Sequence, residues 1–142
     1  MIGWREWISF PELGIAQVKA KVDTGARTSC LHAFVIEPFQ REDESWVRFG
    51  IHPLQGNVEK EVFCEAPVKE QRVVRDSGGH EEQRYVVETP VVIGADQYRV
   101  EVTLTDRDSM RFRALLGRTA IRERYRVDCE KSYLQGRRKR PR

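Results

Sequence analysis

The sequence predicts an all-β protein, and three observations lead to this expectation. Apolar and polar residues alternate in many short segments, turn residues separate these segments at regular spacing, and only one stretch has a helical pattern. The clearest alternation lies at residues 17–22, where Val18, Ala20 and Val22 alternate with three polar side chains. Many short strands at regular spacing predict a closed or sandwiched β fold.

Further strands are expected along the rest of the chain. Residues 72–75 and 83–88 flank a segment with two adjacent glycines, which predicts a β-hairpin with a glycine tip. One short amphipathic helix is expected at residues 118–124. The other strands are expected at residues 46–51, 62–64, 90–93, 98–104 and 111–116.

Length and composition predict one soluble, globular domain. The chain has 142 residues, of which 39% are hydrophobic and 33% charged. No apolar run approaches the roughly 18 residues that a membrane helix needs, and no signal peptide is visible at the N-terminus. We expect a domain at residues 1–135, followed by a disordered basic tail at residues 136–142. A net charge of +3, much of it in this tail, makes nucleic acid an unlikely partner, although the tail could bind a polyanion.

Cysteine usage indicates a reducing compartment. The three cysteines are an odd number, lie far apart and form no Cys-x-x-Cys motif. This pattern argues against a disulfide framework, and it predicts a cytoplasmic protein.

The sharpest motif is Asp23-Thr24-Gly25. The alternating strand at residues 17–22 delivers Asp23 to a tight turn, where Gly25 lets the backbone come close to another chain or a ligand. Thr24 can form a hydrogen bond across such a junction. Alone, the triplet would also fit an ordinary surface turn, because Asp and Gly are common turn residues.

A second motif strengthens the first. Ala114 begins an apolar run that leads through Leu115 and Leu116 into Gly117-Arg118 and the predicted helix. The pair of motifs resembles the retropepsin family, the single-domain relatives of pepsin. The resemblance implies an all-β fold: one retropepsin-like lobe built as a closed β-barrel with one short C-terminal helix, and a hairpin flap between the two motifs that closes over substrate.

The likeness extends over nearly the whole chain, apart from the basic tail. Several stretches look like a bacterial retropepsin-like family named "putative ATP-dependent zinc protease", whose members often occur alongside ATP-grasp ligases that join amino acids to peptides or proteins. These stretches lie at residues 3–7, 20–29, 31–33, 103–110, 115–118, 127–128 and 132–134.

The resemblance implies an aspartic endopeptidase that is active as a homodimer. The chemistry needs two carboxylates that share one proton, because like charges about 3 Å apart cannot both ionise. A single lobe supplies one carboxylate, so a twofold axis supplies the other. Asp76-Ser77-Gly78 resembles a second motif, but no apolar strand precedes it and we interpret it as a turn. The expected catalytic residues are Asp23, Thr24 and Gly25, the expected substrate-binding residues are Ala26, Arg27, Gly78 and Gly79, and the expected supports of the site are Leu115, Leu116, Gly117 and Arg118.

The sequence departs from the retroviral pattern at Arg27. Retroviral members usually carry an acid at this position, and it pairs with the arginine of the Gly-Arg motif. Arg118 must therefore have another partner, for which Asp106, Asp108 and Asp128 are candidates. Arg27 is either an ordinary surface arginine or a residue that faces an acidic substrate.

No metal or other cofactor is expected. The histidines lack the His-Glu-x-x-His spacing of a zinc protease, and there is no Walker glycine loop for ATP. Cys30, His32 and Cys64 could form a metal site, but buried structural roles explain them more simply.

Three classes of function remain open, of which a metal-dependent hydrolase or nucleic-acid-binding protein is the least favoured. The first is the homodimeric aspartic peptidase acting on a peptide or protein. The second is a retropepsin-fold binding or regulatory module, catalytically silent and associated with an ATP-grasp ligase pathway. The intact Asp-Thr-Gly-Ala favours the first, although a fold can keep a motif for structural reasons.

Overall fold

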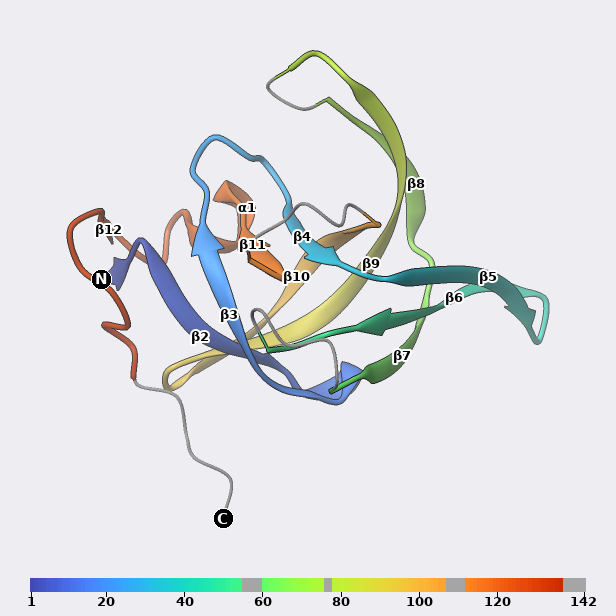
Figure 1. The fold of residues 1–142 in the computed structure, drawn as a ribbon, viewed down its shortest axis with the longest axis horizontal. Helices are drawn as coiled ribbons and strands as arrows, with labels where there is room; N and C mark the ends of the chain where they lie inside the picture. The colour runs from blue at the N-terminus through green and yellow to red at the C-terminus, as the bar shows by residue number, and fades with distance from the viewer. Residues whose placement is uncertain (55–59, 76–77, 107–111, 137–142) are drawn as a thin grey trace.

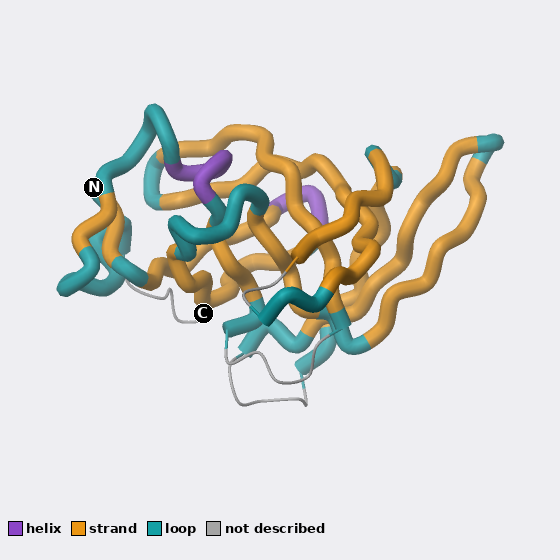
Figure 2. Tube along the Cα trace, turned by 90° about the horizontal axis from the view of Figure 1, so that it is seen from above, coloured by secondary structure: helices purple, strands orange, loops and turns teal. Residues whose placement is uncertain are grey.

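A computed structural model describes residues 1–54, 60–75, 78–106 and 112–136 of the chain (Figure 1). Strands dominate it, and the two helical segments are short (Figure 2). No helix within these ranges is both long and apolar enough to cross a membrane. The elements are β1 Ile2–Gly3, β2 Arg5–Phe10, η1 Pro11–Leu13, β3 Ile15–Val22, β4 Ser29–His32, β5 Val35–Arg41, β6 Glu44–Ile51, β7 Val62–Pro67, β8 Glu70–Arg75, β9 Glu81–Ile93, β10 Asp96–Thr105, β11 Ala114–Leu116, α1 Arg118–Ile121 and β12 Val127–Asp128.

The main sheet closes into a β-barrel, as the sequence predicted. Its strand order is β10-β4-β11-β3-β2-β9-β8, and an additional pairing of β10 with β9 joins the two ends of a six-stranded ring. Strand β8 lies outside this ring and forms a hairpin with β9. Strands β5, β6 and β7 form a separate three-stranded sheet. Barrel closure leaves few unpaired strand edges, which suits a small all-β domain.

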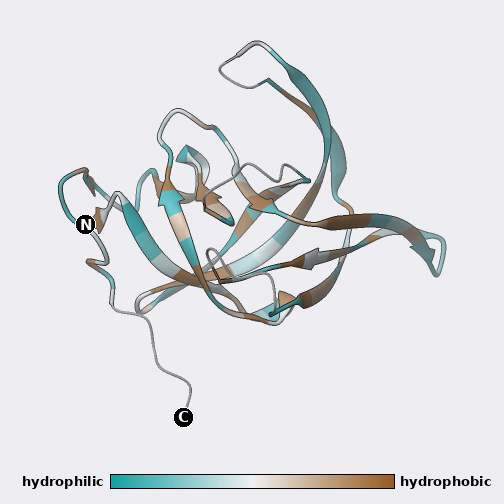
Figure 3. Ribbon diagram, viewed as in Figure 1, coloured by the Kyte–Doolittle hydropathy of each residue, from teal (hydrophilic) through white to brown (hydrophobic). Residues whose placement is uncertain are grey.

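Alternating burial explains why these strands form a barrel. In β3 the side chains of Ile15, Val18, Ala20 and Val22 are buried, while the intervening positions are exposed or half-buried. The same alternation of apolar and polar residues is visible along most strands in Figure 3. Each strand therefore places one apolar face in the interior, and the removal of that face from water drives closure.

Two expected boundaries were wrong. Strand β9 runs without a break from Glu81 to Ile93, so the separate strands expected at 83–88 and 90–93 are one. Pro90 lies within this strand, opposite Arg99 in the antiparallel ladder with β10. The helix expected at residues 118–124 ends at Ile121, since Arg122 leaves the helical conformation and Glu123 has a positive φ of 68°. Arg111, the expected start of the last core strand, lies outside the described residues, and β11 begins at Ala114.

A buried carboxylate ties the two ends of the chain together. Glu6 occupies an inward position of β2 and is 0% exposed. It accepts hydrogen bonds from the backbone N–H groups of Gly3 (2.7 Å), Leu134 (2.9 Å) and Gln135 (2.9 Å). β1 also pairs in parallel with β12. Three donors compensate the cost of burying this carboxylate, which would otherwise be several kcal/mol.

All three cysteines are free thiols, and their surroundings differ. Cys30 and Cys64 are buried, whereas Cys129 is exposed. Burial raises the pKa of Cys64 to about 12. At pH 8 only about 10⁻⁴ of Cys64 would then be thiolate, which is the nucleophilic form.

We therefore expect an alkylating reagent at pH 8 to label Cys129 much faster than Cys64 in the folded protein. Mass spectrometry of the digested, labelled protein measures the three rates separately. In denaturant the rates should converge, since the difference arises from burial. Equal labelling of Cys64 and Cys129 in the folded state would contradict the described packing.

Candidate active site

Asp23 lies at the end of β3, where β11 fixes the start of its loop. β11 lies between β3 and β4, parallel to β3 and antiparallel to β4. The backbone N–H of Asp23 donates to the carbonyl oxygen of Leu116 at 2.9 Å. Since β3 and β4 are joined by the loop that contains Asp23, the inserted strand holds both ends of that loop.

The carboxylate of Asp23 is oriented by its own loop. Its Oδ1 accepts a hydrogen bond from the backbone N–H of Gly25 at 3.0 Å, and its carbonyl oxygen accepts from the N–H of Ala26 at 3.2 Å. Asp23 is half-buried, while Thr24 and Gly25 are exposed. The carboxylate is thus held in one orientation at a surface that another molecule can reach.

The segment after β11 forms hydrogen bonds with the same loop. The N–H groups of Arg118 and Thr119 donate to the carbonyl oxygens of Ala26 (2.8 Å) and Arg27 (3.0 Å). The Nη1 of Arg118 donates to the carbonyl oxygen of Thr24 at 2.9 Å. The expectation that Arg118 pairs with an acid was therefore wrong for Asp106 and Asp128, because the guanidinium binds a backbone carbonyl instead. The third candidate, Asp108, lies outside the described residues.

Gly117 is where the two segments come closest. A Cβ atom placed there would lie 2.6 Å from the carbonyl carbon of Thr28, well inside contact distance. The N–H of Gly117 donates to Oγ of Ser29 at 3.1 Å. Leu116 is fully buried and Leu115 is half-buried. The four residues expected to support the site, Leu115 to Arg118, thus lie against the loop from Asp23 to Ser29.

The β8–β9 hairpin extends beyond the barrel on the side of the Asp23 loop (Figure 1). Gly78 and Gly79 are exposed at its tip, and Gly79 has a φ of 81° that favours glycine. Asp76 and Ser77, interpreted above as a turn, lie outside the described residues. The hairpin reaches the loop at its base, where Nη1 of Arg72 donates to Oγ1 of Thr28 at 3.2 Å.

Arg27 presents a positive charge beside this loop. Its side chain is exposed, and its carbonyl oxygen is bound by Thr119. Among the residues that the structure describes, no acidic group forms an ion pair with it. The side chain is therefore available to an external anion.

A sequence model of one protein family matches residues 1–138, and its description is "RimB-like: Retropepsin-like aspartic endopeptidase RimB". The chain belongs to the RimB-like family. The description names an aspartic endopeptidase and mentions no zinc, so it does not support the zinc in the family name given above. The resemblance to retropepsins is confirmed at the level of family and fold.

Curated relatives of the chain are much longer than it is. A protein of Shewanella pealeana named "Probable alpha-L-glutamate ligase" is 45% identical over 136 residues, which is 96% of this chain and 30% of that protein. A protein of Parasynechococcus marenigrum with the same name is 47% identical over 136 residues, 96% of this chain and 29% of that protein. The chain therefore spans about a third of the length of the curated relatives it matches.

A solved structure has the same fold. It is the protein Lpg0085 of unknown function from Legionella pneumophila, with a TM-score of 0.78 and 23% sequence identity. The superposition covers 94% of this chain and 96% of that chain. At this level of identity the likeness concerns the fold alone.

Cys30, His32 and Cys64, the residues considered above for a metal, do not form a zinc centre among the described residues. Cys30 and His32 are both buried on β4, and Cys64 is buried on β7. Within the described ranges, no group of three or more His, Cys, Asp or Glu side chains could hold a metal ion.

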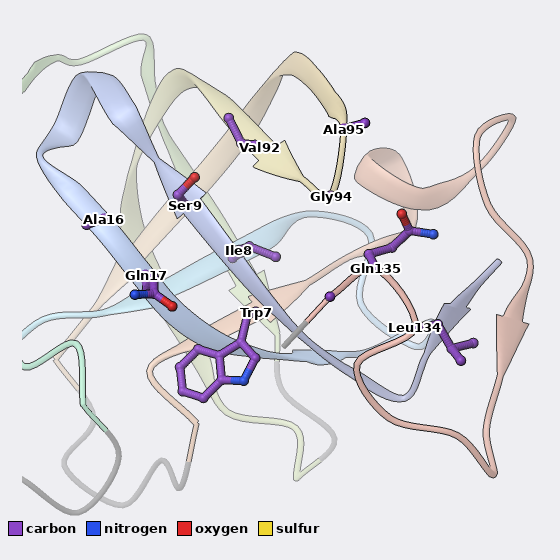
Figure 4. A pocket seen from close by; sticks show the side chains of 11 residues that line it. Trp7, Ile8, Ser9, Ala16, Gln17, Val92, Gly94, Ala95, Leu134 and Gln135 are labelled. Atoms are coloured by element: carbon purple, nitrogen blue, oxygen red, sulfur yellow. The ribbon is translucent and has the colours of Figure 1, made fainter. Parts of the chain in front are cut away.

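One pocket is lined by residues of β2, β3, β9 and the C-terminal segment (Figure 4), and Asp23 is not among its lining residues. It sits at the opposite end of β3, between β2, the end of β9 and the C-terminal segment. Its lining contains no acid or base. The residues that line it are Trp7, Ile8, Ser9, Ala16, Gln17, Val92, Gly94, Ala95, Leu134, Gln135 and Gly136. We therefore place the candidate site at the Asp23 loop and not in this pocket.

The close approach at Gly117 leads to a stability prediction. Gly117→Ala should lower the free energy of unfolding by about 2–3 kcal/mol, because the new Cβ meets backbone atoms that cannot move aside. Denaturant unfolding measures the change. Gly25→Ala is the matched control, since its Cβ would meet one side-chain oxygen, Oδ1 of Asp23 at 3.2 Å, and no backbone atom. Equal losses for the two variants would contradict the described contact.

Proposed function

We propose that the chain is an aspartic endopeptidase that acts as a homodimer. One observation carries the proposal: the Asp23 carboxylate is fixed by Gly25 N–H at an accessible surface, on a loop that β11 and Arg118 hold from behind. A loop needed only as a turn would not require such support. Membership of a family described as aspartic endopeptidases supports the same activity.

The proposed chemistry uses Asp23 from each of two subunits. One carboxylate takes a proton from water, and the resulting oxygen attacks the peptide carbonyl carbon. The other, protonated, carboxyl donates its proton to the carbonyl oxygen. The tetrahedral intermediate then collapses, the C–N bond breaks, and the leaving nitrogen receives a proton from the dyad. Thr24 and Gly25, both exposed beside Asp23, are the residues that a twofold-related copy would meet first.

Replacing the proposed catalytic acid tests the activity directly. Asp23→Asn should lower peptide cleavage by about 10²–10⁴-fold, because an amide cannot accept the proton of water. Mass-spectrometric readout on a proteome-derived peptide library at several pH values gives the rate and the sequence preference. Asp43→Asn is the control, since Asp43 lies in the exposed β5–β6 turn and asparagine tolerates its positive φ of 66°. Equal cleavage by wild type and Asp23→Asn would contradict the proposal.

The same variant tests the homodimer. Adding an equal amount of Asp23→Asn to wild type doubles the number of dimers. Random exchange of subunits leaves about a quarter of these dimers with two wild-type chains, so the activity should fall to half. Sedimentation at the assay concentration should show the dimer itself. Unchanged activity on mixing would mean that each chain acts alone or that subunits do not exchange, and sedimentation separates these two outcomes.

We further propose that the substrate is acidic. Arg27 is exposed beside Asp23 without an acidic partner among the described residues, and relatives of the chain are named as glutamate ligases. A charge-assisted hydrogen bond contributes about 1.5 kcal/mol or more, which corresponds to roughly tenfold in rate.

Glutamate-rich peptides should therefore be cleaved faster than neutral ones, and Arg27→Gln should reduce this preference about tenfold. Competition between acidic and neutral peptides in one reaction measures the preference. Arg126→Gln, another exposed arginine, serves as control because it lies beside β12 and not beside Asp23. Equal cleavage of acidic and neutral peptides by wild type would exclude the idea.

A second function follows from the length of the relatives. Because the chain matches only about 30% of proteins named as ligases, it could serve as a binding or regulatory module that pairs with an ATP-grasp ligase. Absence of cleavage by wild type and Asp23→Asn alike, together with a change in ligase activity on adding the chain, would favour this function over the peptidase.

A further inference from the structure

Two arginines stand directly opposite each other on the β8–β9 hairpin. Arg72 and Arg84 are cross-strand partners in the register, so their side chains leave the same face. Like charges at opposed positions destabilise a β-ladder. Each is balanced by carboxylates: Arg72 by Glu70 and Glu101, and Arg84 by Glu82. Because the repulsion between Arg72 and Arg84 has to be offset by carboxylates, the stability of the hairpin alone does not explain this pair.

Arg72 joins three parts of the molecule. From β8 its Nη2 donates to Glu101 of β10 at 2.8 Å and also to Glu70, and its Nη1 donates to Oγ1 of Thr28 at 3.2 Å. The hydrogen bonds that Arg72 donates to Glu70 and Glu101 raise its pKa further, so its charge is retained at all physiological pH values. Thr28 belongs to the Asp23 loop, and its backbone is the surface against which Gly117 is packed.

Arg84 reaches the same loop by a buried path. Its side chain is only 10% exposed, and its Nε donates to Glu82 at 3.0 Å. Its Nη1 lies 3.4 Å from Oγ1 of Thr103, which donates to the carbonyl oxygen of Ser29 at 3.3 Å. Oγ of Ser29 in turn accepts the N–H of Gly117. Arg72 therefore contacts Thr28 directly, and Arg84 is linked to the next residue, Ser29, through Thr103.

Arg75 also lies on the hairpin, but its ion pair stabilises the hairpin alone. Arg75 pairs with Glu81 across the same two strands, and their side chains are 70% and 52% exposed. This pair connects the hairpin only with itself, whereas Arg72 and Arg84 connect the hairpin with the barrel and the loop.

We propose that Arg72 and Arg84 are positioning residues that hold the base of the hairpin on residues 28–29, so that this base and the Asp23 loop move as one unit. The inference rests on the proposed peptidase, in which the hairpin is a lid over substrate. The position of the lid base is transmitted to Asp23 through Thr28, Ser29 and Gly117.

The Arg72–Thr28 contact gives the sharpest test. Thr28→Val should lower kcat/KM about tenfold, mainly through kcat, because it removes the hydrogen bond from Arg72 that orients the loop. Arg72→Gln removes the same hydrogen bond together with those to Glu70 and Glu101, so its loss should be at least as large. Thr28→Ser keeps the hydroxyl and should keep the wild-type rate. The double variant should lose no more than Arg72→Gln alone, which is the signature of a shared interaction. Arg75→Gln is the matched control and should match wild type.

Arg84 needs a gentler variant, since its buried side chain could not be replaced without risk to folding. Thr103→Val keeps the shape and removes the hydroxyl that links Arg84 to Ser29. It should lower kcat/KM by a similar factor. Additive losses in the Arg72→Gln/Thr28→Val double variant, or wild-type kinetics for both Thr28→Val and Thr103→Val, would overturn the proposal.

Hydrogen exchange separates this inference from the proposed activity, because it needs no substrate. In Arg72→Gln the backbone amides of residues 70–75 and 23–30 should both exchange faster than in wild type, while Arg75→Gln should leave residues 23–30 unchanged. If wild type cleaves no peptide but this coupled exchange occurs, the peptidase fails and the anchor stands. If residues 23–30 exchange alike in Arg72→Gln and wild type, the anchor is wrong whatever the activity.

Discussion

The insertion of β11 between β3 and β4 is the constraint on which the structure of the site depends. The loop that carries Asp23 has no regular hydrogen-bonding partner of its own. Its shape depends on β11 and the residues after it, which come almost a hundred residues later in the sequence. Leu116 binds the backbone of Asp23 at the start of the loop, and Arg118 binds carbonyl oxygens further along the loop. The chain bears the entropic cost of bringing these segments together. In return, an acidic side chain stands at the surface on a rigid support.

The arginines near the β8–β9 hairpin and those of the Asp23 loop region differ in their partners. Around the hairpin, each described arginine that faces the barrel has a carboxylate partner, which limits the cost of partial burial. Arg27 and Arg118 depart from this pattern. Arg118 uses its guanidinium on a backbone carbonyl, which fixes geometry without neutralising charge, and Arg27 remains exposed. The loop region therefore keeps positive charge close to Asp23, which suits an anionic ligand.

Alternation and turn residues are local signals, so they predicted many short strands and the hairpin, whereas the closed barrel was implied by the resemblance to retropepsins. These signals missed β5, and they missed β4 because Ser29 to His32 is buried on every residue and shows no alternation. The partner of Arg118 was missed because a carbonyl has no side-chain signature. Arg72 and Arg84 could have been paired by counting outwards from the glycines of the tip, but Thr28 and Ser29 as their targets depend on the closed barrel. No strand was expected at residues 5–10, so the buried position of Glu6 in β2 was not predicted.

The clasp formed by Glu6 has a consequence for the order in which the barrel can close. Its partners Leu134 and Gln135 are 128 and 129 residues away in the sequence. The strand β11, which lies between β3 and β4, is also distant in sequence from both. Contacts of such large sequence separation form slowly, whereas local hairpins such as β5–β6 can form early. Before β11 docks, the facing edges of β3 and β4 are unpaired and open to association with other chains.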